Sequence, residues 1–264
     1  MGIEGIKKKE IIRELIQQKG KLAVSEITNI LKVSEVTARK YLKELEKENV
    51  LSTTYGGALL KKRDFAKDCG FGENTSKNRL EKRAIAAKAF SLIKEGQTIF
   101  LDIGTTVFEL SRLIRKIGLG IVVVTNSMPA ISELINNENV ETFVLGGMYG
   151  NELMGFSGSY ARIRLERMYF DQSFLRVEGI SSKLGLTEKD HYASEIQDIV
   201  IKNSGIVNLL ASSSKIGKNS LIQSESFQKI KNIKRLITDS KADKNELEQI
   251  RKKWELEIIR AVTS

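Results

Sequence analysis

Apolar residues recur at helical spacing through the first part of the chain. Three segments place apolar side chains three or four residues apart, as amphipathic helices do, and they cover residues 8–20, 24–32 and 35–49. A fourth segment, VLSTTYGGALLKK, alternates around a Gly-Gly pair as a β-hairpin does. These four elements predict a winged helix-turn-helix, and a plain three-helix bundle is the alternative.

The third of these segments carries the residues that would meet DNA. Ser34 precedes it and is suited to cap its amino end. The apolar spacing predicts that Val36, Leu42 and Leu45 are buried. In a winged helix-turn-helix the third helix lies in the major groove, so its outward side chains reach bases and phosphates. We therefore predict DNA contacts from that outward face, through Ser34, Glu35, Thr37, Arg39, Lys40 and Lys43.

The pattern changes after residue 78. Short apolar runs alternate with amphipathic helices, beginning with a helix at 79–96 and a strand at 97–102. Such alternation predicts an α/β domain with a doubly wound, mostly parallel sheet. The stretch 63–78 has little apolar periodicity, and we interpret it as a linker. The predicted organisation is a DNA-binding domain at 1–62, this linker, and a second domain at 79–264.

Polar residues follow several of the predicted strands. In an open α/β sheet, ligands lie outside the carboxyl ends of the strands. Gly104 would let the backbone approach a ligand, and the free N–H groups of the helix that follows favour an anion. Lys215 would add a positive charge. We predict a site for an anion or a sugar-like ligand, built from Asp102, Gly104, Thr105, Thr106, Asn126, Gly146, Gly147 and Lys215.

The distribution of charge favours a nucleic-acid partner. The chain has a net charge of +10. Residues 1–62 hold 13 Lys and Arg against 8 Glu, whereas the rest holds 30 basic and 25 acidic residues. The positive excess per residue is therefore about three times higher in the first segment. A solvated lysine-rich surface is the alternative.

The residues that are rare in this chain exclude several classes of site. A single cysteine, Cys69, rules out a disulfide within the chain, and a single histidine, His191, makes an ordinary zinc site improbable. The chain starts without an apolar leader and has no apolar run of membrane-spanning length. We expect a cytoplasmic protein without metal, cofactor or membrane contact. No phosphate loop, dinucleotide fingerprint or nucleophile elbow occurs, and no general acid–base pair can be assembled.

Ordered motifs along nearly the whole chain resemble the DeoR family of bacterial transcriptional regulators. They include VSEITNILKVSEVTARKYLKELEKENVLSTTYGGA, then LDIGTT, VVTNS, VLGG, GFSG, DQSF, SEIQ and SKIG. The resemblance implies a sensor domain of the sugar-phosphate-isomerase-like fold that binds a phosphorylated sugar or related metabolite. It also implies double-stranded operator DNA as partner and a homodimer or higher homo-oligomer. By position it adds Asp171 and Glu195 to the effector residues, and it supports Ser34, Thr37 and Arg39 as recognition residues.

Departures from the family pattern bear on the effector and on DNA. Arg176 replaces a glycine, Ser181 replaces an acid, and Ser212 replaces the Asp of D-x-S-K-F-G. In the recognition helix, Lys40 and Tyr41 replace Arg and Asp, and Ser52-Thr53-Thr54 stand where an arginine is usual. The preferred function is an operon repressor released by an anionic metabolite, not an enzyme. An isomerase with an added N-terminal module and an adaptor that senses no metabolite are the alternatives.

Overall fold

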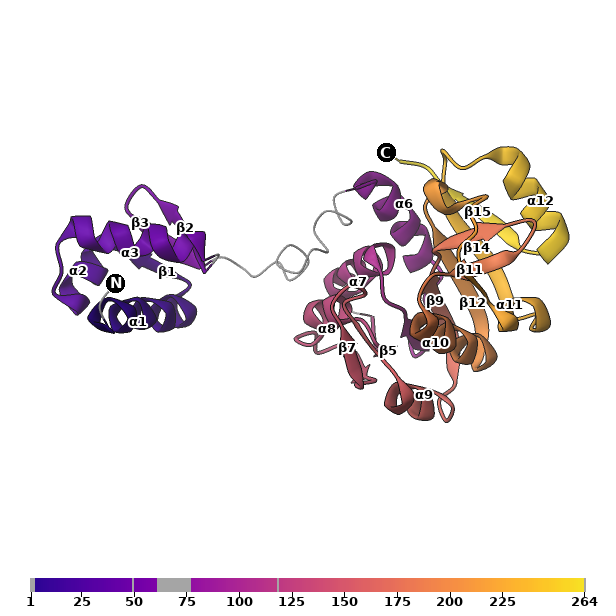
Figure 1. Ribbon diagram of the computed structural model, residues 1–264, viewed down its shortest axis with the longest axis horizontal. Helices are drawn as coiled ribbons and strands as arrows, with labels where there is room; N and C mark the ends of the chain where they lie inside the picture. The colour runs from indigo at the N-terminus through magenta and orange to yellow at the C-terminus, as the bar shows by residue number, and fades with distance from the viewer. Residues whose placement is uncertain (1–2, 49, 61–76, 118, 264) are drawn as a thin grey trace. The chain divides into compact units, whose positions relative to one another are not determined.

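The computed structural model describes residues 3–48, 50–60, 77–117 and 119–263. Backbone contacts divide the chain into two units, residues 1–64 and 65–264 (Figure 1). All but the last two residues of the predicted linker lie outside the described residues. The boundaries at 62 and 79 therefore stay predictions.

The N-terminal unit is a winged helix-turn-helix, as predicted. Its helices and strands are α1 (Ile3–Lys19), β1 (Lys21–Ala23), α2 (Val24–Leu31), α3 (Glu35–Lys47), β2 (Leu51–Thr54) and β3 (Gly57–Leu60). The predicted hairpin is β2–β3, and β1, which was not predicted, pairs with β3. A Cβ atom at Gly57 would lie 2.1 Å from the carbonyl oxygen of Leu22. This close approach of β1 to β3 explains why the wing needs glycine at that position.

The third helix differs from the prediction in one residue of its core face. Ser34 caps it as predicted, because its Oγ accepts the backbone N–H of Thr37 at 3.2 Å. The buried residues, however, are Ala38, Leu42 and Leu45. Val36 is 80% exposed, so its predicted burial was wrong. Two residues correspond to a rotation of about 200° around a helix, which turns Val36 away from the face that Ala38 presents to the core.

The C-terminal unit is built on a seven-stranded sheet in which every neighbouring pair is parallel. In order across the sheet the strands are β15 (Glu257–Ala261), β14 (Ile233–Asp239), β12 (Ser204–Ala211), β9 (Phe170–Arg176), β4 (Thr98–Leu101), β5 (Ile121–Thr125) and β6 (Val140–Val144). The chain builds outward from β4 through β5 to β6, and then resumes on the other side of β4 with β9. The doubly wound prediction is confirmed, and the switch in direction falls between β4 and β9.

Helices cover both faces of this sheet (Figure 1). One face packs against α6 (Arg79–Phe90), α7 (Thr105–Ile117) and α8 (Met128–Leu134), and the other against α9 (Ser159–Leu165), α10 (His191–Lys202) and α12 (Lys244–Trp254). Alternate residues of β4 point to opposite faces, as the pleat requires. Ile99 and Leu101 join the core under α6 and α7, while Phe100 joins the core under α10.

Five short strands, one 3₁₀ turn and one short helix complete the described part of the C-terminal unit. They are the hairpin β7 (Met148–Gly150) with β8 (Gly155–Ser157), the antiparallel strands β10 (Gly179–Ser181), β11 (Gly185–Glu188) and β13 (Ile222–Gln223), the 3₁₀ turn η1 (Ser213–Lys215) and the helix α11 (Glu225–Lys229). A single strand was predicted over 171–180, but β9 ends at Arg176 and β10 belongs to a separate sheet. None of the helices in the described ranges is long and apolar enough to cross a membrane.

Candidate functional site

The amino end of α7 faces the switch point of the sheet. β4 ends at Leu101, and Gly104 turns the chain with a φ of +110° before α7 begins at Thr105. The first helical backbone bond of this turn runs from Phe108 N–H to the Gly104 carbonyl at 2.9 Å. The N–H groups of the helix's opening turn are therefore left for a partner outside the helix, and they favour an anion.

A cavity of about 320 Å³ opens beside this turn. Four of the predicted effector residues line it, namely Gly104, Thr105, Thr106 and Lys215. It has four further cationic side chains on its wall, Lys77, Lys82, Lys189 and Arg176, against two carboxylates, Glu152 and Glu178. The lining is positively charged in sum, which suits a phosphate or another anionic group.

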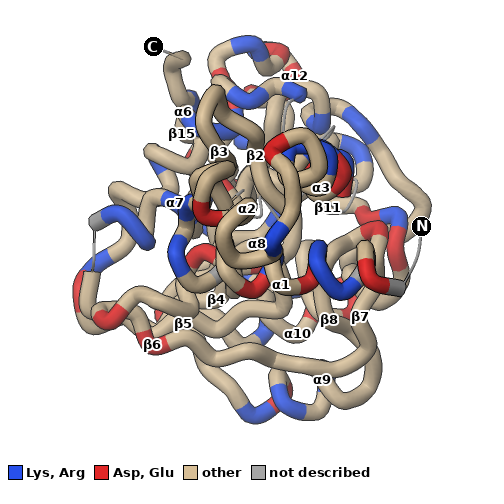
Figure 2. The backbone as a smooth tube through the Cα atoms, turned by 90° about the vertical axis from the view of Figure 1, so that its left-hand side faces the viewer, with Lys and Arg blue, Asp and Glu red and all other residues tan. Residues whose placement is uncertain are grey.

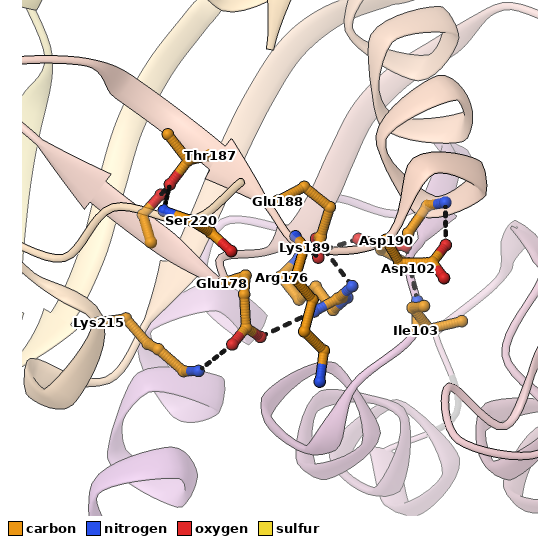
Figure 3. A network of polar contacts seen from close by, with 12 residues as sticks. Asp102, Ile103, Arg176, Glu178, Thr187, Glu188, Lys189, Asp190, Lys215 and Ser220 are labelled. Atoms are coloured by element: carbon orange, nitrogen blue, oxygen red, sulfur yellow. Dashed lines mark hydrogen bonds and ion pairs between the residues drawn. The ribbon is translucent and has the colours of Figure 1, made fainter. Parts of the chain in front are cut away.

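Arg176 lies in this cavity within an ion-pair network (Figure 3). Its side chain is only 12% exposed, and one guanidinium nitrogen lies 2.7 Å from the buried carboxylate of Glu188. A second nitrogen lies 3.3 Å from Glu178. A Cβ atom at Gly104 would lie 3.0 Å from the aliphatic stem of Arg176 and would crowd it, and the φ of +110° also disfavours any residue other than glycine there. These contacts hold the arginine beside the anion-favouring turn.

Lys215 joins the same network from η1. Its ammonium lies 2.9 Å from the Oε1 atom of Glu178, whose other oxygen contacts Arg176. Glu178 thus bridges the two cations, as the dashed lines of Figure 3 show. The hydroxyl groups of Ser212 and Ser214 bond each other at 2.9 Å on the same wall. Lys215 therefore presents its charge to the cavity already paired with a carboxylate.

Asp102 lies beneath the cavity and does not line it. Its Oδ2 atom accepts the Arg176 backbone N–H at 3.2 Å and the Gln197 side-chain amide at 2.9 Å, while Oδ1 accepts the N–H of Ile103. Burial raises the pKa of Asp102 to about 6, and the charge of Arg176 and these hydrogen bonds oppose the rise. Asp102 ties β4 to β9 and α10 and was expected instead to take sugar hydroxyls.

Lys82, on α6, is a cavity residue that was not predicted. Its side chain is buried, and this burial lowers its pKa to about 8. The carboxylate of Glu109 opposes that change, whereas the nearby charges of Lys215 and Lys77 lower the pKa further. An anion in the cavity would offset this repulsion among the lysines.

The remaining predicted effector residues lie elsewhere. Asn126 is buried and donates to the Phe156 carbonyl at 3.1 Å. Gly146 and Gly147 form the turn after β6 with positive φ angles, and Gly147 and Glu195 line a second hollow beside α9 and α10. The structure does not bring these four residues to the cavity beside α7.

Asp171, predicted as an effector residue, lies away from the cavity beside α7. Asp171 is the second residue of β9, and its carboxylate accepts the N–H of Thr98, the first residue of β4, at 2.8 Å. Both strands run in the same direction, so this pair marks the amino edge of the sheet. The cavity is at the carboxyl edge, at the far end of both strands.

The predicted DNA-contacting residues lie along α3 and at its amino end. Ser34, Glu35, Arg39, Lys40 and Lys43 are exposed and Thr37 is half-buried. Arg39 lies 3.7 Å from Glu35 and donates to the Tyr55 carbonyl at the tip of the wing at 3.4 Å. Positive and negative residues are interspersed along α1 and α3 (Figure 2).

Two family models match this chain in succession. The model described as the DeoR-like helix-turn-helix domain matches residues 8–64. The model described as the DeoR C terminal sensor domain matches residues 77–240. The chain belongs to the DeoR family. It is a DNA-binding transcription regulator rather than an enzyme.

Named relatives of this DeoR-family chain act on sugar operons. It is 34% identical over 250 residues to the lactose phosphotransferase system repressor of Streptococcus mutans, covering 94% of this chain and 96% of the relative. It is 34% identical over 226 residues to the L-fucose operon activator of Haemophilus influenzae, covering 85% and 89%. Ribose 5-phosphate isomerase A from Methanocaldococcus jannaschii is 20% identical with a TM-score of 0.39, covering 53% of this chain and 55% of that one.

The structure gives roles to the departures from the DeoR pattern. Arg176 enters the cavity, and Ser212 lines it. Ser181 is the last residue of β10, and its hydroxyl donates to Asn219 and accepts the N–H of Leu184. On the wing, the hydroxyl and the backbone N–H of Thr53 both donate to the carboxylate of Glu46 on α3. Thr53 therefore joins the wing to the recognition helix.

Proposed function

We propose that this DeoR-family regulator represses a carbohydrate or related catabolic operon in the cytoplasm. A phosphorylated sugar or a similar anionic metabolite releases it from the operator. One observation carries the proposal: the amino end of α7 opens into a cavity lined by Thr105, Thr106 and several cations. The repressor among the named relatives supports the sign of regulation, and the activator among them marks the opposite sign as the alternative.

The phosphate of the effector would bind to the opening turn of α7. The N–H groups after Gly104 donate to it, the hydroxyls of Thr105 and Thr106 add donors, and Lys82 and Lys215 add charge. Sensing requires that the ligand bind one conformation more tightly than another, by about 1–3 kcal/mol in a typical allosteric coupling. No group in this arrangement has to transform the ligand.

The test is a titration of the protein–operator complex with a panel of sugar phosphates. We compare the wild type with Thr105→Glu, which places a carboxylate at the proposed phosphate site, and with Thr263→Glu, the same change outside the cavity. The wild type and the control should release the operator, whereas Thr105→Glu should stay bound. Equal release by Thr105→Glu would place the effector elsewhere. No release of any of the three proteins would favour the adaptor function, in which Arg176 fills the cleft.

We also propose a homodimer held mainly through the 79–264 domain, with residues 1–62 binding DNA and 63–78 linking the two. Pairing gives two recognition helices for two half-sites about 10 bp, or a multiple of 10 bp, apart. Large apolar side chains are exposed on neighbouring elements β6, β7, α9 and α10, and they are Phe143, Met148, Tyr149, Tyr160, Ile163 and Tyr192. A face of this kind is typical of a protein interface. Arg162 and Glu195 lie in the same hollow, so the face carries both charges that a self-complementary contact needs.

Sedimentation tests the dimer. Tyr160→Glu should convert it to monomer at micromolar concentration, whereas Tyr169→Glu, an exposed tyrosine just before β9 at the amino edge of the sheet, should leave it intact. A wild type that remains monomeric with and without DNA would contradict this proposal.

A further inference from the structure

Val36 is an exposed apolar residue whose presence the fold does not explain. It lies in the first turn of α3 and is 80% exposed. The core beneath this helix is filled by Ala38, Leu42 and Leu45. A β-branched residue is also a weaker helix former than the Lys or Glu residues that suit a solvated face. Neither packing nor helix propensity therefore accounts for valine here.

The position of Val36 is that of a base reader. Residues three, four and seven apart share one side of a helix, which groups Val36 with Arg39, Lys40 and Lys43. In helix-turn-helix proteins the amino-terminal residues of the recognition helix contact base edges. Val36 is in that turn and projects from the outward face, so it would reach the floor of the major groove together with Arg39.

The polar side chains of this turn are engaged within the protein. The hydroxyls of Ser34 and Thr37 bond each other at 2.9 Å, and the Ser34 oxygen also caps the helix. Glu35 lies 3.7 Å from Arg39. Val36, by contrast, has no polar group that needs a hydrogen-bond partner, and it does not pack into the core.

The chemistry of the groove leaves one partner for such a side chain. Valine carries only methyl groups, and the major-groove edges of the base pairs carry donors, acceptors and one apolar group, the C5 methyl of thymine. Against cytosine or adenine, the same methyl groups would cover an amino donor without replacing its hydrogen bond to water. We propose that Val36 reads a thymine methyl group in each operator half-site and thereby selects T·A at that position.

The proposal also locates the thymine relative to a second base. Val36 and Arg39 are about 5–6 Å apart on the helix surface. Successive base pairs are about 3.4 Å apart along the duplex. The thymine should therefore lie within about two base pairs of the base that Arg39 contacts, which we expect to be guanine because Arg binds its O6 and N7 atoms bidentately.

Methyl deletion in the DNA tests this inference, which rests on DNA binding through α3. The wild-type protein is first used to enrich an operator duplex from random sequences. Each thymine is then replaced singly by deoxyuridine, which lacks only the methyl group. At one position in each half-site, deoxyuridine should weaken wild-type binding about fourfold per methyl, the value of one buried methylene. Val36→Ala should discriminate less between the thymine and deoxyuridine duplexes at that position, because only its Cβ methyl remains.

Two further variants serve as controls for this result. Val36→Thr keeps the shape of valine but exchanges one methyl for a hydroxyl, so it should retain part of the thymine preference. Ile30→Ala removes a partly exposed apolar side chain from α2, outside the recognition helix, and should keep the full preference. Unchanged thermal unfolding of all three variants would show that they fold.

Three results would overturn the proposal. One is a wild type that tolerates deoxyuridine at every thymine. Another is a Val36→Ala variant that keeps the wild-type preference for thymine. The third is a wild type that enriches no duplex at all, which would also remove the assignment of α3 as the DNA-reading helix, whereas the first two leave that assignment intact.

Discussion

Arg39 and Arg176 differ in how far neighbouring groups compensate their charge. Arg39, on the recognition helix, is 49% exposed, and its contacts with Glu35 and the Tyr55 carbonyl are 3.7 and 3.4 Å long. Arg176, in the cavity, is 12% exposed and lies 2.7 Å from Glu188. Glu188 is itself only 2% exposed, and Glu178 contacts the same guanidinium. Arg39 keeps its charge for a partner, whereas the charge of Arg176 is compensated within the fold.

The difference teaches where the binding charge of each unit comes from. In the N-terminal unit, the exposed arginine and lysines of α3 are the charges that we expect to meet DNA. In the cavity, Arg176 mainly neutralises buried carboxylates, so an incoming anion would depend on the lysines and on the amino end of α7. A guanidinium in a pocket is therefore weaker evidence for ligand contact than an ammonium whose pKa the pocket has lowered, such as that of Lys82.

The largest effect should come from removing the compensated arginine. Arg176→Ala leaves the buried carboxylate of Glu188 without its cation, and breaking such a pair from one side costs about 3–5 kcal/mol. Urea unfolding of the full chain should show this loss in the transition of the C-terminal unit. Replacing both partners, as Arg176→Met with Glu188→Leu, should restore most of the stability. If Arg176→Ala unfolds at the same urea concentration as the wild type, then Arg176 is not needed to compensate Glu188. The contrast with Arg39 would then not hold.

Removing the exposed charges should affect DNA binding and leave the fold intact. Arg39→Ala with Lys40→Ala should weaken operator binding by about 1–3 kcal/mol if Arg39 contacts a base. The slope of log affinity against log salt should fall by about one unit for each lost phosphate contact. Unfolding free energy should change by less than about 0.5 kcal/mol per residue, as for other surface substitutions.

The matched control for this pair is Arg251→Ala with Lys252→Ala, two exposed cations near the end of α12. It removes the same net charge from the chain, so any loss it shares with the α3 variant is non-specific. Identical salt slopes for the two double variants would contradict a DNA-contacting role for Arg39 and Lys40.

The smallest effect should be a pH dependence centred on Lys82. Burial lowers its pKa in the folded protein to about 8, below the ordinary lysine value of 10.5, so it loses its charge as pH rises through 8. A phosphate ester has its second pKa near 6 and stays dianionic in this range. Calorimetry with a sugar phosphate that binds should therefore show weaker binding at pH 9 than at pH 7, by a few fold.

The lowered pKa of Lys82 also predicts that the free energy of unfolding changes with pH in the direction opposite to ligand affinity. Between pH 8 and 10.5 the unfolded state binds more protons at Lys82 than the folded state, so the contribution of this lysine to stability rises with pH. Lys82→Met should abolish both the binding and the stability trends in this range. A wild type whose phosphate affinity increases from pH 7 to 9 would exclude Lys82 from the site.

Local pattern was enough to predict most of the fold. The short apolar runs followed by amphipathic helices gave the parallel sheet, and the alternation around the Gly-Gly pair gave the wing. Val36 was misplaced because the spacing of apolar residues in α3 allows two starting points, and only packing against α1 and α2 selects Ala38. The extra strand β1 is three residues long and exists through its pairing with β3, which no local pattern reports.

The lining of the candidate cavity could be predicted where it depends on strand ends, but not where it depends on tertiary contacts. Thr105, Thr106 and Lys215 follow the carboxyl ends of strands and line the cavity. Asp171 was expected at the same place, but it is the second residue of β9 and lies at the opposite edge of the sheet. The pairing of Arg176 with Glu188 could not be read from sequence, because the β10–β11 hairpin folds back to bring the two together.

Glu178 is a tethered competitor for any anion that enters the cavity. Its carboxylate already contacts both Lys215 and Arg176, and it is attached to the same chain, so its effective concentration there is high. An anion that binds Lys215 would have to displace this internal carboxylate, so the bridge lowers the apparent affinity of that contact by a constant factor. If the proposed effector binds here, we expect this bridge to raise the effector concentration needed for half-maximal release of the operator.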